Sequence, residues 1–530
     1  MPQVLIHLRG PANLLPVFLK AASLVILGQL LHPIHACAQP GAPIWTNRFN
    51  GTGNSLDVAY AAAADRTGNL IVGGFSRRTG SPNSEDFLTI KYSSTGLALW
   101  TNRYNAPDDS GDYVRVVACD EAGNAFVTGH SVSTNNWDDV VTIKYSAVGV
   151  PLWTNRYDGP GHYDDRPYSL VAHPNGKVYV AGYASGENSF SDFFVLAYAS
   201  DGLPLWTNRY DGPVNDYDEG YAMTASDSGN VFITGWSFGV DYEEECVTVA
   251  YSATGTPLWT NMYNGPGLGD DVGAAVAADF AGNAVVAAFS RGNGTDYDFA
   301  IIKYSPAGVA LWTNRYNGPA NGQDIPAAVG IDANGNVFVT GYSPGIGSGN
   351  DYVTLKYSSS GVPLWTNRYN GPGNSIDEVR SLVLDNHGNV IVTGYSRRTA
   401  NAGSEDFATI AYSNNGIPLW TNRYNGPGNG DDRAFRVVAA NGSVFVTGYS
   451  AGSGTSDDYA AVKYAGPVLS PIPLTLQRSG NQVMLNWTNP VFRLQTASAV
   501  IGGYTNIPGA VSTFTNSITD GQKYFRLREN

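Results

Sequence analysis

Eight copies of the tripeptide Trp-Thr-Asn divide this chain into a regular array. Their tryptophans lie 53 residues apart through the middle of the array and 55 residues apart at each end. They are Trp45, Trp100, Trp153, Trp206, Trp259, Trp312, Trp365 and Trp420. A period near 50 residues, with four short strand-like runs and no helical pattern, predicts β-propeller blades rather than a helical solenoid.

The period that follows Trp365 shows the repeating unit clearly. After an Asn-Gly-Pro-Gly turn comes a first run at 377–385, and a tight turn at 387–389 leads to the second run. That second run, 390–393, is Val-Ile-Val-Thr, whose β-branched residues suit a strand. The third run, 406–412, ends before a turn into the next Leu-Trp-Thr-Asn. Each unit therefore predicts a blade of four strands, ordered from the axis to the rim.

The number of copies predicts how the ring closes. The first three runs occur eight times between Asp57 and Tyr464, whereas the Trp-Thr-Asn run begins one position earlier, at Trp45. The strand around 44–49 should therefore supply the outer strand of the last blade, whose other runs lie in 432–464. This pairing gives eight complete blades over 39–466 and leaves no exposed edge. A ring of seven would leave one copy unpaired.

The segment 1–38 has the composition of a secretory signal peptide. Arg9 and Lys20 precede an apolar stretch, 21–31, and Ala36-Cys37-Ala38 has the small-residue form of a cleavage site. Cleavage near Ala38 would place the mature protein outside the cytoplasm, secreted or at the cell surface or periplasm. The stretch is shorter than the roughly 20 residues of a membrane helix, and no later segment approaches that length. An uncleaved anchor, or a lipoprotein modified at Cys37, is the alternative.

The repeat stops at Pro467, and a different segment, 467–530, follows. Three prolines form a stiff linker, and the alternating apolar residues after it predict a small all-β module. With Leu485-Asn486-Trp487 and Tyr524-Phe525-Arg526-Leu527 it resembles the short sandwich-like C-terminal domains of secreted bacterial proteins. That resemblance implies a role in attaching, orienting or sorting the protein.

Two family resemblances concern the array itself. The pattern Asp-x-x-Gly-Asn-x-x-Val-Thr-Gly at 332–341, with the run 351–357 that leads to Trp365, resembles the SBBP-type β-propeller repeat. This resemblance covers about 45–464 and implies an extracytoplasmic protein that binds or scaffolds. That family's name implies seven blades, and this chain departs from it with eight.

The spacing Gly-x-x-x-Trp, as at Gly202 to Trp206, is similar to the tryptophan-docking motif of eight-bladed quinoprotein-type propellers. It implies that each tryptophan packs between neighbouring blades. The adjacent cysteines with which quinone enzymes clamp their cofactor do not occur here. Outside 1–38 the chain has only Cys119 and Cys246, which fall in different blades and predict neither a disulfide nor a metal site.

An aspartate stands twelve residues after each repeat tryptophan, at the start of the first run. These residues are Asp57, Asp112, Asp165, Asp218, Asp271, Asp324, Asp377 and Asp432. One interpretation is that they accept hydrogen bonds from turn amides. The other is that eight carboxylates around one mouth bind a cation such as Ca²⁺, or attract a basic partner.

A second acidic position recurs at the start of the third run, on the same face. It is occupied by Asp86, Asp139, Asp192, Glu245, Asp298, Asp351, Asp406 and Asp458. Catalysis by carboxylates needs one unequal pair, whereas these are repeated in every blade, which favours structural residues and a protein that is not an enzyme. His162 and Tyr163, in one loop of this face, break the repeat and are candidate binding residues.

Charge narrows the partners of the chain. Residues 1–38 contain two basic residues and no acidic one, so the mature chain would carry 29 basic and 45 acidic residues. Nucleic acid and anionic membranes are poor partners for such a surface. Arginines recur at one position of the outer strand, as at Arg103 and Arg368, where they should pair with neighbouring carboxylates.

These observations predict a noncatalytic, monomeric, extracytoplasmic propeller that binds a protein or a polysaccharide through its acidic loop face. It would need no cofactor, with Ca²⁺ a candidate ion. The alternatives are a secreted polysaccharide lyase or hydrolase, for which the loop 162–166 comes nearest to a unique site, and an assembly factor of the cell envelope.

Overall fold

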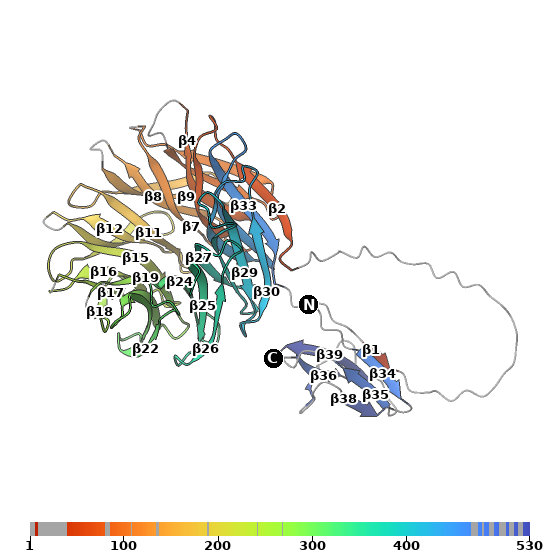
Figure 1. The fold of residues 1–530 in the computed structure, drawn as a ribbon. Helices are drawn as coiled ribbons and strands as arrows, with labels where there is room; N and C mark the ends of the chain where they lie inside the picture. The colour runs from red at the N-terminus through yellow and green to blue at the C-terminus, as the bar shows by residue number, and fades with distance from the viewer. Residues whose placement is uncertain are drawn as a thin grey trace, which may run out of the picture. The chain divides into compact units, whose positions relative to one another are not determined.

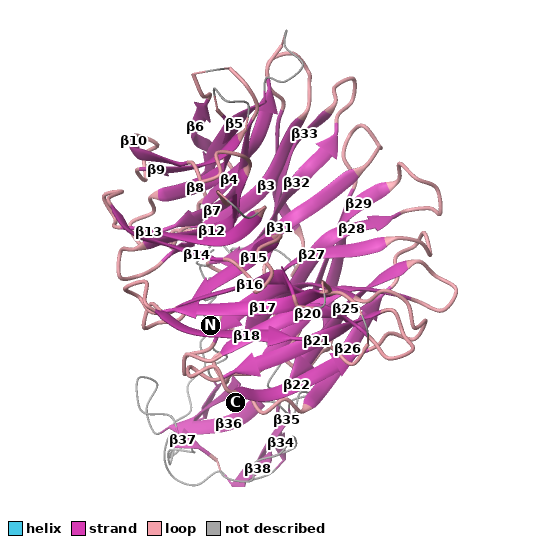
Figure 2. Ribbon diagram, turned by 90° about the vertical axis from the view of Figure 1, so that its left-hand side faces the viewer, coloured by secondary structure: helices cyan, strands magenta, loops and turns pink. Residues whose placement is uncertain are grey.

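The computed structural model describes residues 6–8, 40–79, 85–107, 109–133, 137–187, 190–240, 242–267 and 269–467, and short strands between 475 and 529. The described residues form strands and loops and contain no helix (Figure 2). No described segment could therefore cross a membrane as a helix. The chain divides into two units, one of 38–467 and one of 1–37 with 468–530.

The larger unit is a ring of eight four-stranded antiparallel sheets, the blades of a propeller (Figure 1). We number the blades in chain order from the one that begins at β3. The innermost strands are β3 (Asp57–Ala64), β7 (Asp112–Cys119), β11 (Asp165–Ala172), β15 (Asp218–Ala225), β19 (Asp271–Ala278), β23 (Ile325–Ile331), β27 (Asp377–Leu384) and β31 (Asp432–Ala440).

The second strand of each blade follows a tight turn and is almost wholly buried. These strands are β4 (Leu70–Arg77), β8 (Ala125–Val132), β12 (Val178–Ser185), β16 (Val231–Phe238), β20 (Ala284–Arg291), β24 (Val337–Pro344), β28 (Val390–Arg397) and β32 (Ser443–Ala451). The third strands are β5 (Glu85–Tyr92), β9 (Asp138–Tyr145), β13 (Ser191–Tyr198), β17 (Glu244–Tyr251), β21 (Tyr297–Tyr304), β25 (Asn350–Tyr357), β29 (Glu405–Tyr412) and β33 (Asp457–Ala465).

The outer strands carry the Trp-Thr-Asn tripeptides. In chain order they are β2 (Pro43–Phe49), β6 (Ala98–Tyr104), β10 (Pro151–Tyr157), β14 (Pro204–Tyr210), β18 (Pro257–Tyr263), β22 (Ala310–Tyr316), β26 (Pro363–Tyr369) and β30 (Pro418–Tyr424). The strand β2 pairs with β33 in the order β2-β33-β32-β31. The predicted eight blades and their closure by the N-terminal strand are thus confirmed.

The hydrophobic core lies between neighbouring blades. One cluster, for example, joins Tyr179 and Phe193 of the third blade to Ile233 and Val247 of the fourth. Each second strand, apolar on both faces, packs against the blades before and after its own. Because every blade needs two neighbours to bury these faces, a closed ring satisfies all eight blades at once.

The smaller unit contains two short sheets. One has the order β34-β35-β38, formed by Thr475–Ser479, Gln482–Asn486 and Phe514–Ser517. The other has the order β1-β39-β36-β37, formed by Ile6–Leu8, Lys523–Glu529, Phe492–Ala497 and Thr505–Asn506. The all-β module expected after Pro467 therefore has strands where the sequence predicts them. The proposed cleavage region and Cys37, with Trp487 of the module, lie outside the described residues.

Candidate functional site

The loops that precede the first strand and those between the second and third strands emerge on one face of the ring, which we call the loop face. All eight aspartates of the first acidic set reach this face at the start of the innermost strands, and all eight side chains are buried. Each accepts a hydrogen bond from the backbone N–H six residues before it, at 2.6 Å from Gly212 to Asp218. The same bond occurs in the other seven blades.

These hydrogen bonds fix the conformation of each loop. They agree with the interpretation that the aspartates accept hydrogen bonds from turn amides. Burial raises the pKa of Asp165 to about 7 and that of Asp218 to about 6. The role of the eight aspartates in binding a partner stays a prediction.

The second acidic set is paired with the outer-strand arginines. In seven blades the arginine of Trp-Thr-Asn-Arg forms an ion pair with the aspartate of the third strand, at 2.9 Å between Arg368 and Asp351. The six equivalent pairs have N···O distances of 2.5 to 3.0 Å. Arg368 also donates to the main chain of Ser343 and to the Tyr316 hydroxyl of the preceding blade. The predicted arginine pairing is confirmed within these seven blades, and in five of them the arginine also bonds a tyrosine hydroxyl of the preceding blade.

Among the described residues, two places on the loop face gather three carboxylates each. Asp139, Asp158 and Asp165 form one cluster, and Asp192, Asp211 and Asp218 form the equivalent cluster one blade further on. In each cluster the carboxylate oxygens lie within 4.8 Å of one another. Asp158 and Asp211 occupy a position that is asparagine in the other six loops. Oxygen donors of this kind suit Ca²⁺, although Asp139 and Asp192 are each already paired with an arginine.

His162 proves to be a turn residue as well as a departure from the repeat. Its φ of 55° is the left-handed conformation that Asn54, Asn215 and Asn374 adopt at equivalent positions. Its Nδ1 lies 2.8 Å from Asp158, and this hydrogen bond raises the pKa of His162. The same contact, between an asparagine and the residue four positions later, closes the loops of other blades, as from Asn370 to Asn374.

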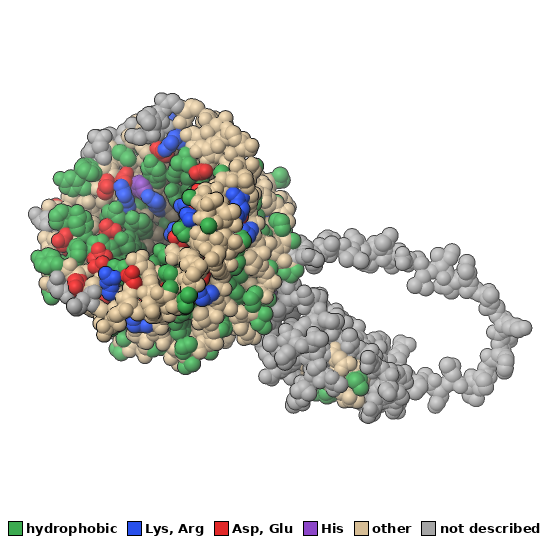
Figure 3. Space-filling model, in the orientation of Figure 1, with side chains coloured by type: hydrophobic (Ala, Val, Ile, Leu, Met, Phe, Trp, Pro, Cys, Tyr) green, Lys and Arg blue, Asp and Glu red, His purple; other side chains and the backbone are tan. Residues whose placement is uncertain are grey.

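Exposed aromatic residues form two pairs on the loop face, at the junctions of the second with the third blade and of the third with the fourth. Trp137 meets Tyr163 edge to face, with ring centroids 5.0 Å apart. Phe190 stacks on Tyr217, with centroids 4.6 Å apart and planes inclined by 22°. All four side chains are more than 40% exposed. In the space-filling view, hydrophobic side chains lie at the margin of a hollow where charged side chains gather (Figure 3).

Of these four aromatic residues, only Tyr163 was expected from the sequence. Trp137 and Phe190 stand at the same place in the repeat, one residue before the third strand. In the other six blades this position holds Ser84, Glu243, Asp296, Gly349, Ser404 and Ser456. Comparing this loop position across the blades would therefore have revealed both rings.

Together these observations define an eight-bladed β-propeller whose loop face carries carboxylates and paired aromatic rings. No family model matches the chain. It is 20% identical, over 490 residues, to an uncharacterized WD repeat-containing protein of Acanthamoeba polyphaga mimivirus. That alignment covers 72% of this chain and 32% of the viral protein, so the chain spans about a third of that relative's length.

Solved structures similar to the chain include the WD40 domain of SCAP from fission yeast, at 9% identity and a TM-score of 0.43, covering 80% of this chain and 98% of that domain. Another is the polysaccharide lyase Uly1, at 10% identity and a TM-score of 0.41, covering 80% of this chain and all of the lyase. At this level of similarity they carry no argument about function.

Proposed function

We propose that this protein is a noncatalytic, extracytoplasmic binding propeller that holds a polysaccharide chain across the loop face of its second, third and fourth blades. The observation that carries the proposal is the arc of exposed aromatic pairs, Trp137 with Tyr163 and Phe190 with Tyr217. Large apolar side chains grouped at the surface of a soluble protein mark an interaction site.

The chemistry of the arc suits sugars. Aromatic rings present flat apolar faces on which the C–H face of a pyranose ring can pack. Carboxylates beside them, such as Asp158 and Asp211, accept hydrogen bonds from sugar hydroxyls. Repetition of the pair at two successive blade junctions suits a ligand that is itself a repeating chain. The noncatalytic part of the proposal is supported by the two acidic sets, whose members are paired or bonded alike in nearly every blade.

The test is binding of the full chain to a neutral β-glucan, to alginate and to an unrelated protein, measured by affinity electrophoresis and calorimetry. W137A/F190A removes one ring from each pair, and F280A is the matched control. Phe280 is 74% exposed but lies in a turn between β19 and β20, on the opposite face. We expect a polysaccharide to bind the wild type and F280A, and to bind W137A/F190A at least about tenfold more weakly, the loss of two stacked rings.

Glycan binding that survives in W137A/F190A would refute the proposed surface. Release of reducing ends from a bound polysaccharide would instead establish the enzyme alternative. Binding of the unrelated protein alone would move the proposal to a protein ligand.

A further inference from the structure

The axis of the propeller contains a cavity that is not part of the loop-face site. It measures about 210 Å³ and is lined by Tyr60, Arg115, Tyr168, Arg380, Phe435 and Arg436. The first five of these residues occupy the same position, the fourth, in the innermost strands of five consecutive blades around the ring. Arg436 follows Phe435 in β31.

A β-bulge directs the fourth residue toward the axis. In every innermost strand the pairing with the second strand skips this residue, as at Tyr60 between Ala59 and Ala61 and at Arg380 between Val379 and Ser381. Such a bulge re-aims a side chain, and it does so identically in all eight blades. The remaining blades place Tyr221, Ala274 and Ala327 at this position, so the arginines gather on one side of the axis.

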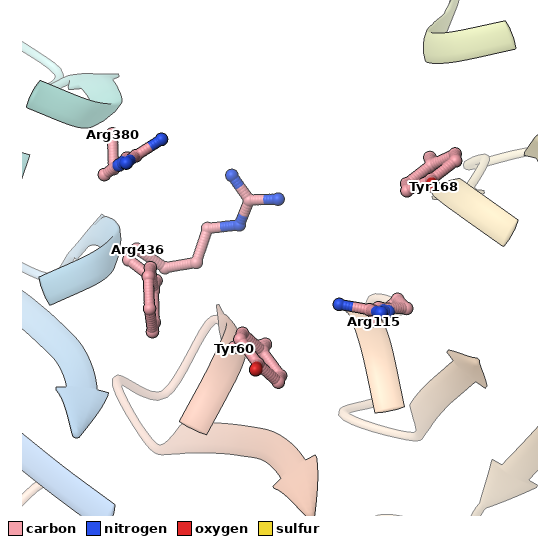
Figure 4. Close-up of a pocket in the computed structure, with 6 residues that line it drawn as sticks. Tyr60, Arg115, Tyr168, Arg380 and Arg436 are labelled. Carbon is pink, nitrogen blue, oxygen red and sulfur yellow. The ribbon is translucent and has the colours of Figure 1, made fainter. Parts of the chain in front are cut away.

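Three guanidinium groups thus meet around one small space. The guanidinium of Arg436 extends into the middle of the cavity, with Arg115 and Arg380 on either side of it (Figure 4). Arg115 lies over the ring of Tyr60, with its guanidinium carbon 5.4 Å from the ring centroid. Arg380 forms an ion pair with Glu378, with 2.7 Å between the guanidinium nitrogen and the carboxylate oxygen.

Arg436 has no counterion among the residues that the structure describes. Within the described part of the chain, no ion pair or hydrogen bond is formed by its guanidinium, and burial lowers its pKa with no carboxylate to oppose the effect. A second nearby carboxylate, Glu219, accepts a hydrogen bond from Tyr221 of the fourth blade. The side chain of Arg436 is half-buried, so part of the cost of withdrawing an unpaired charge from water falls on the folded protein. The protein as a whole has more acidic than basic residues, 45 against 31. The wall of this cavity instead holds three arginines, of which one is paired with a carboxylate.

We infer that the axial cavity binds a small organic carboxylate, held by Arg436 with Arg115 and packed between the rings of Tyr60, Tyr168 and Phe435. The planar guanidinium matches a carboxylate with two parallel hydrogen bonds. The aromatic walls suit a ligand with a flat or apolar body attached to the charge, such as a sugar acid or an aromatic acid. The cavity is smaller than the 300 Å³ or more of a pocket for a drug-sized ligand, so only a small molecule fits within it.

The test measures binding of glucuronate, benzoate, acetate and inorganic phosphate to the full chain by calorimetry and by thermal shift. The variants are R436M and R436K, and the matched control is R66M. Arg66 is exposed and pairs with Glu121 at the surface. We expect glucuronate or benzoate to bind the wild type and R66M. R436M should bind at least about tenfold more weakly, because one charge-assisted pair is lost, and R436K should be intermediate.

Unliganded R436M also reports on the fold. Since no described residue pairs with the Arg436 guanidinium, we expect R436M to melt at the wild-type temperature or above it. A large fall would show that the arginine has a structural partner and would overturn the inference. Binding unchanged in R436M, no binding of any carboxylate, or equally tight binding of phosphate would overturn it as well.

Discussion

At the residue scale, the loop face is built from carboxylates that the fold keeps close together. Asp165 and Asp218 are buried, and each lies within 4.8 Å of two further carboxylates. Burial is the main cause that raises their pKa, and the nearby Asp158 and Asp211 add to it. The negative charges in each of these two clusters repel one another. The other six loops have a neutral asparagine in place of Asp158 or Asp211, so this repulsion is weaker there.

This repulsion gives the stability of the protein a definite pH dependence. The pKa of Asp165 is about 7 in the folded chain against an ordinary value of 3.8, so the folded state holds more protons between about pH 4 and pH 7. The free energy of unfolding must then fall as pH rises through this range. We expect D158N/D211N, which restores the residue of the other loops, to lessen this fall. The gain at pH 8 should be about 0.5–1 kcal/mol. It should vanish near pH 5, where protonated Asp165 no longer repels Asp158 and where the variant lacks the pair between Asp158 and protonated His162.

Melting curves at several pH values measure the effect, with D227N, at an exposed turn of the opposite face, as the control. Parallel pH profiles for the wild type and D158N/D211N would contradict the prediction. The same proteins test the cation prediction: if Ca²⁺ binds these clusters, it should raise the melting temperature of the wild type at pH 8 and not that of D158N/D211N.

At the element scale, the Trp-Thr-Asn tripeptide is a docking device between blades. In seven of the eight outer strands the tryptophan indole donates to a carbonyl in the turn before the next outer strand, as from Trp153 to Ser200 at 3.2 Å. The indole of Trp420 makes no such bond in the described structure. The asparagine two residues later donates to the glycine of that turn, from Asn155 to Gly202 at 2.7 Å. The asparagine bond recurs in all eight outer strands, Asn422 reaching Gly41 beside the closing strand. Through these bonds the outer strand of one blade contacts the turn of the next blade.

Glycine is required in this turn for two reasons, its backbone conformation and its close approach to the tryptophan ring. Gly202 has a φ of +89°, and a Cβ there would lie 2.7 Å from the Trp153 ring. Gly294 has a similar φ of +85° but nothing within 4 Å of a Cβ. We therefore expect G294A to cost about 1 kcal/mol of stability through backbone strain alone. G202A should cost about 2 kcal/mol more, because the turn must move away from the indole.

Chemical denaturation of the two variants measures this difference. If G202A and G294A lose equal stability, the close approach of glycine to tryptophan does not contribute to the interface between blades.

At the scale of the whole molecule, closure of the ring depends on one short strand. The pairing of β2 with β33 joins Pro43 to Tyr464 and Phe49 to Tyr459, and Arg48 forms its ion pair with Asp458 across it. The indole of Trp45 then docks on the first blade, donating to Ser94. The two ends of the array are in this way held together without a covalent link.

Removal of this strand should open the ring. We expect a chain lacking residues 1–49 to melt well below the full-length protein and to aggregate, because β33 becomes an exposed edge that can pair with another chain. A chain lacking residues 1–39 keeps β2 and is the control. Thermal melting and light scattering of the two truncated chains make the comparison, and equal behaviour would show that closure does not depend on β2.

Much of this architecture could be predicted from the sequence, because its signals are local and repeated eight times. Glycine turns, β-branched runs and the count of Trp-Thr-Asn copies determine the strands, their order in a blade and the extra strand at the N-terminal end. The pairing of Arg368 with Asp351 was predictable for the same reason, since each blade repeats it. For His162 the sequence indicated a departure from the repeat, and its left-handed turn became apparent only in the structure.

Only the tertiary structure decided which of the unrepeated side chains meet. Trp137 and Tyr163 belong to different blades, and Arg115, Arg380 and Arg436 are separated by as many as 321 residues, yet the ring brings each set together. The bulge that turns the fourth residue of each innermost strand toward the axis leaves no mark in the alternation of apolar and polar residues. Local sequence therefore determined the blades, whereas the closed ring and its bulges, which act between distant residues, determined the sites.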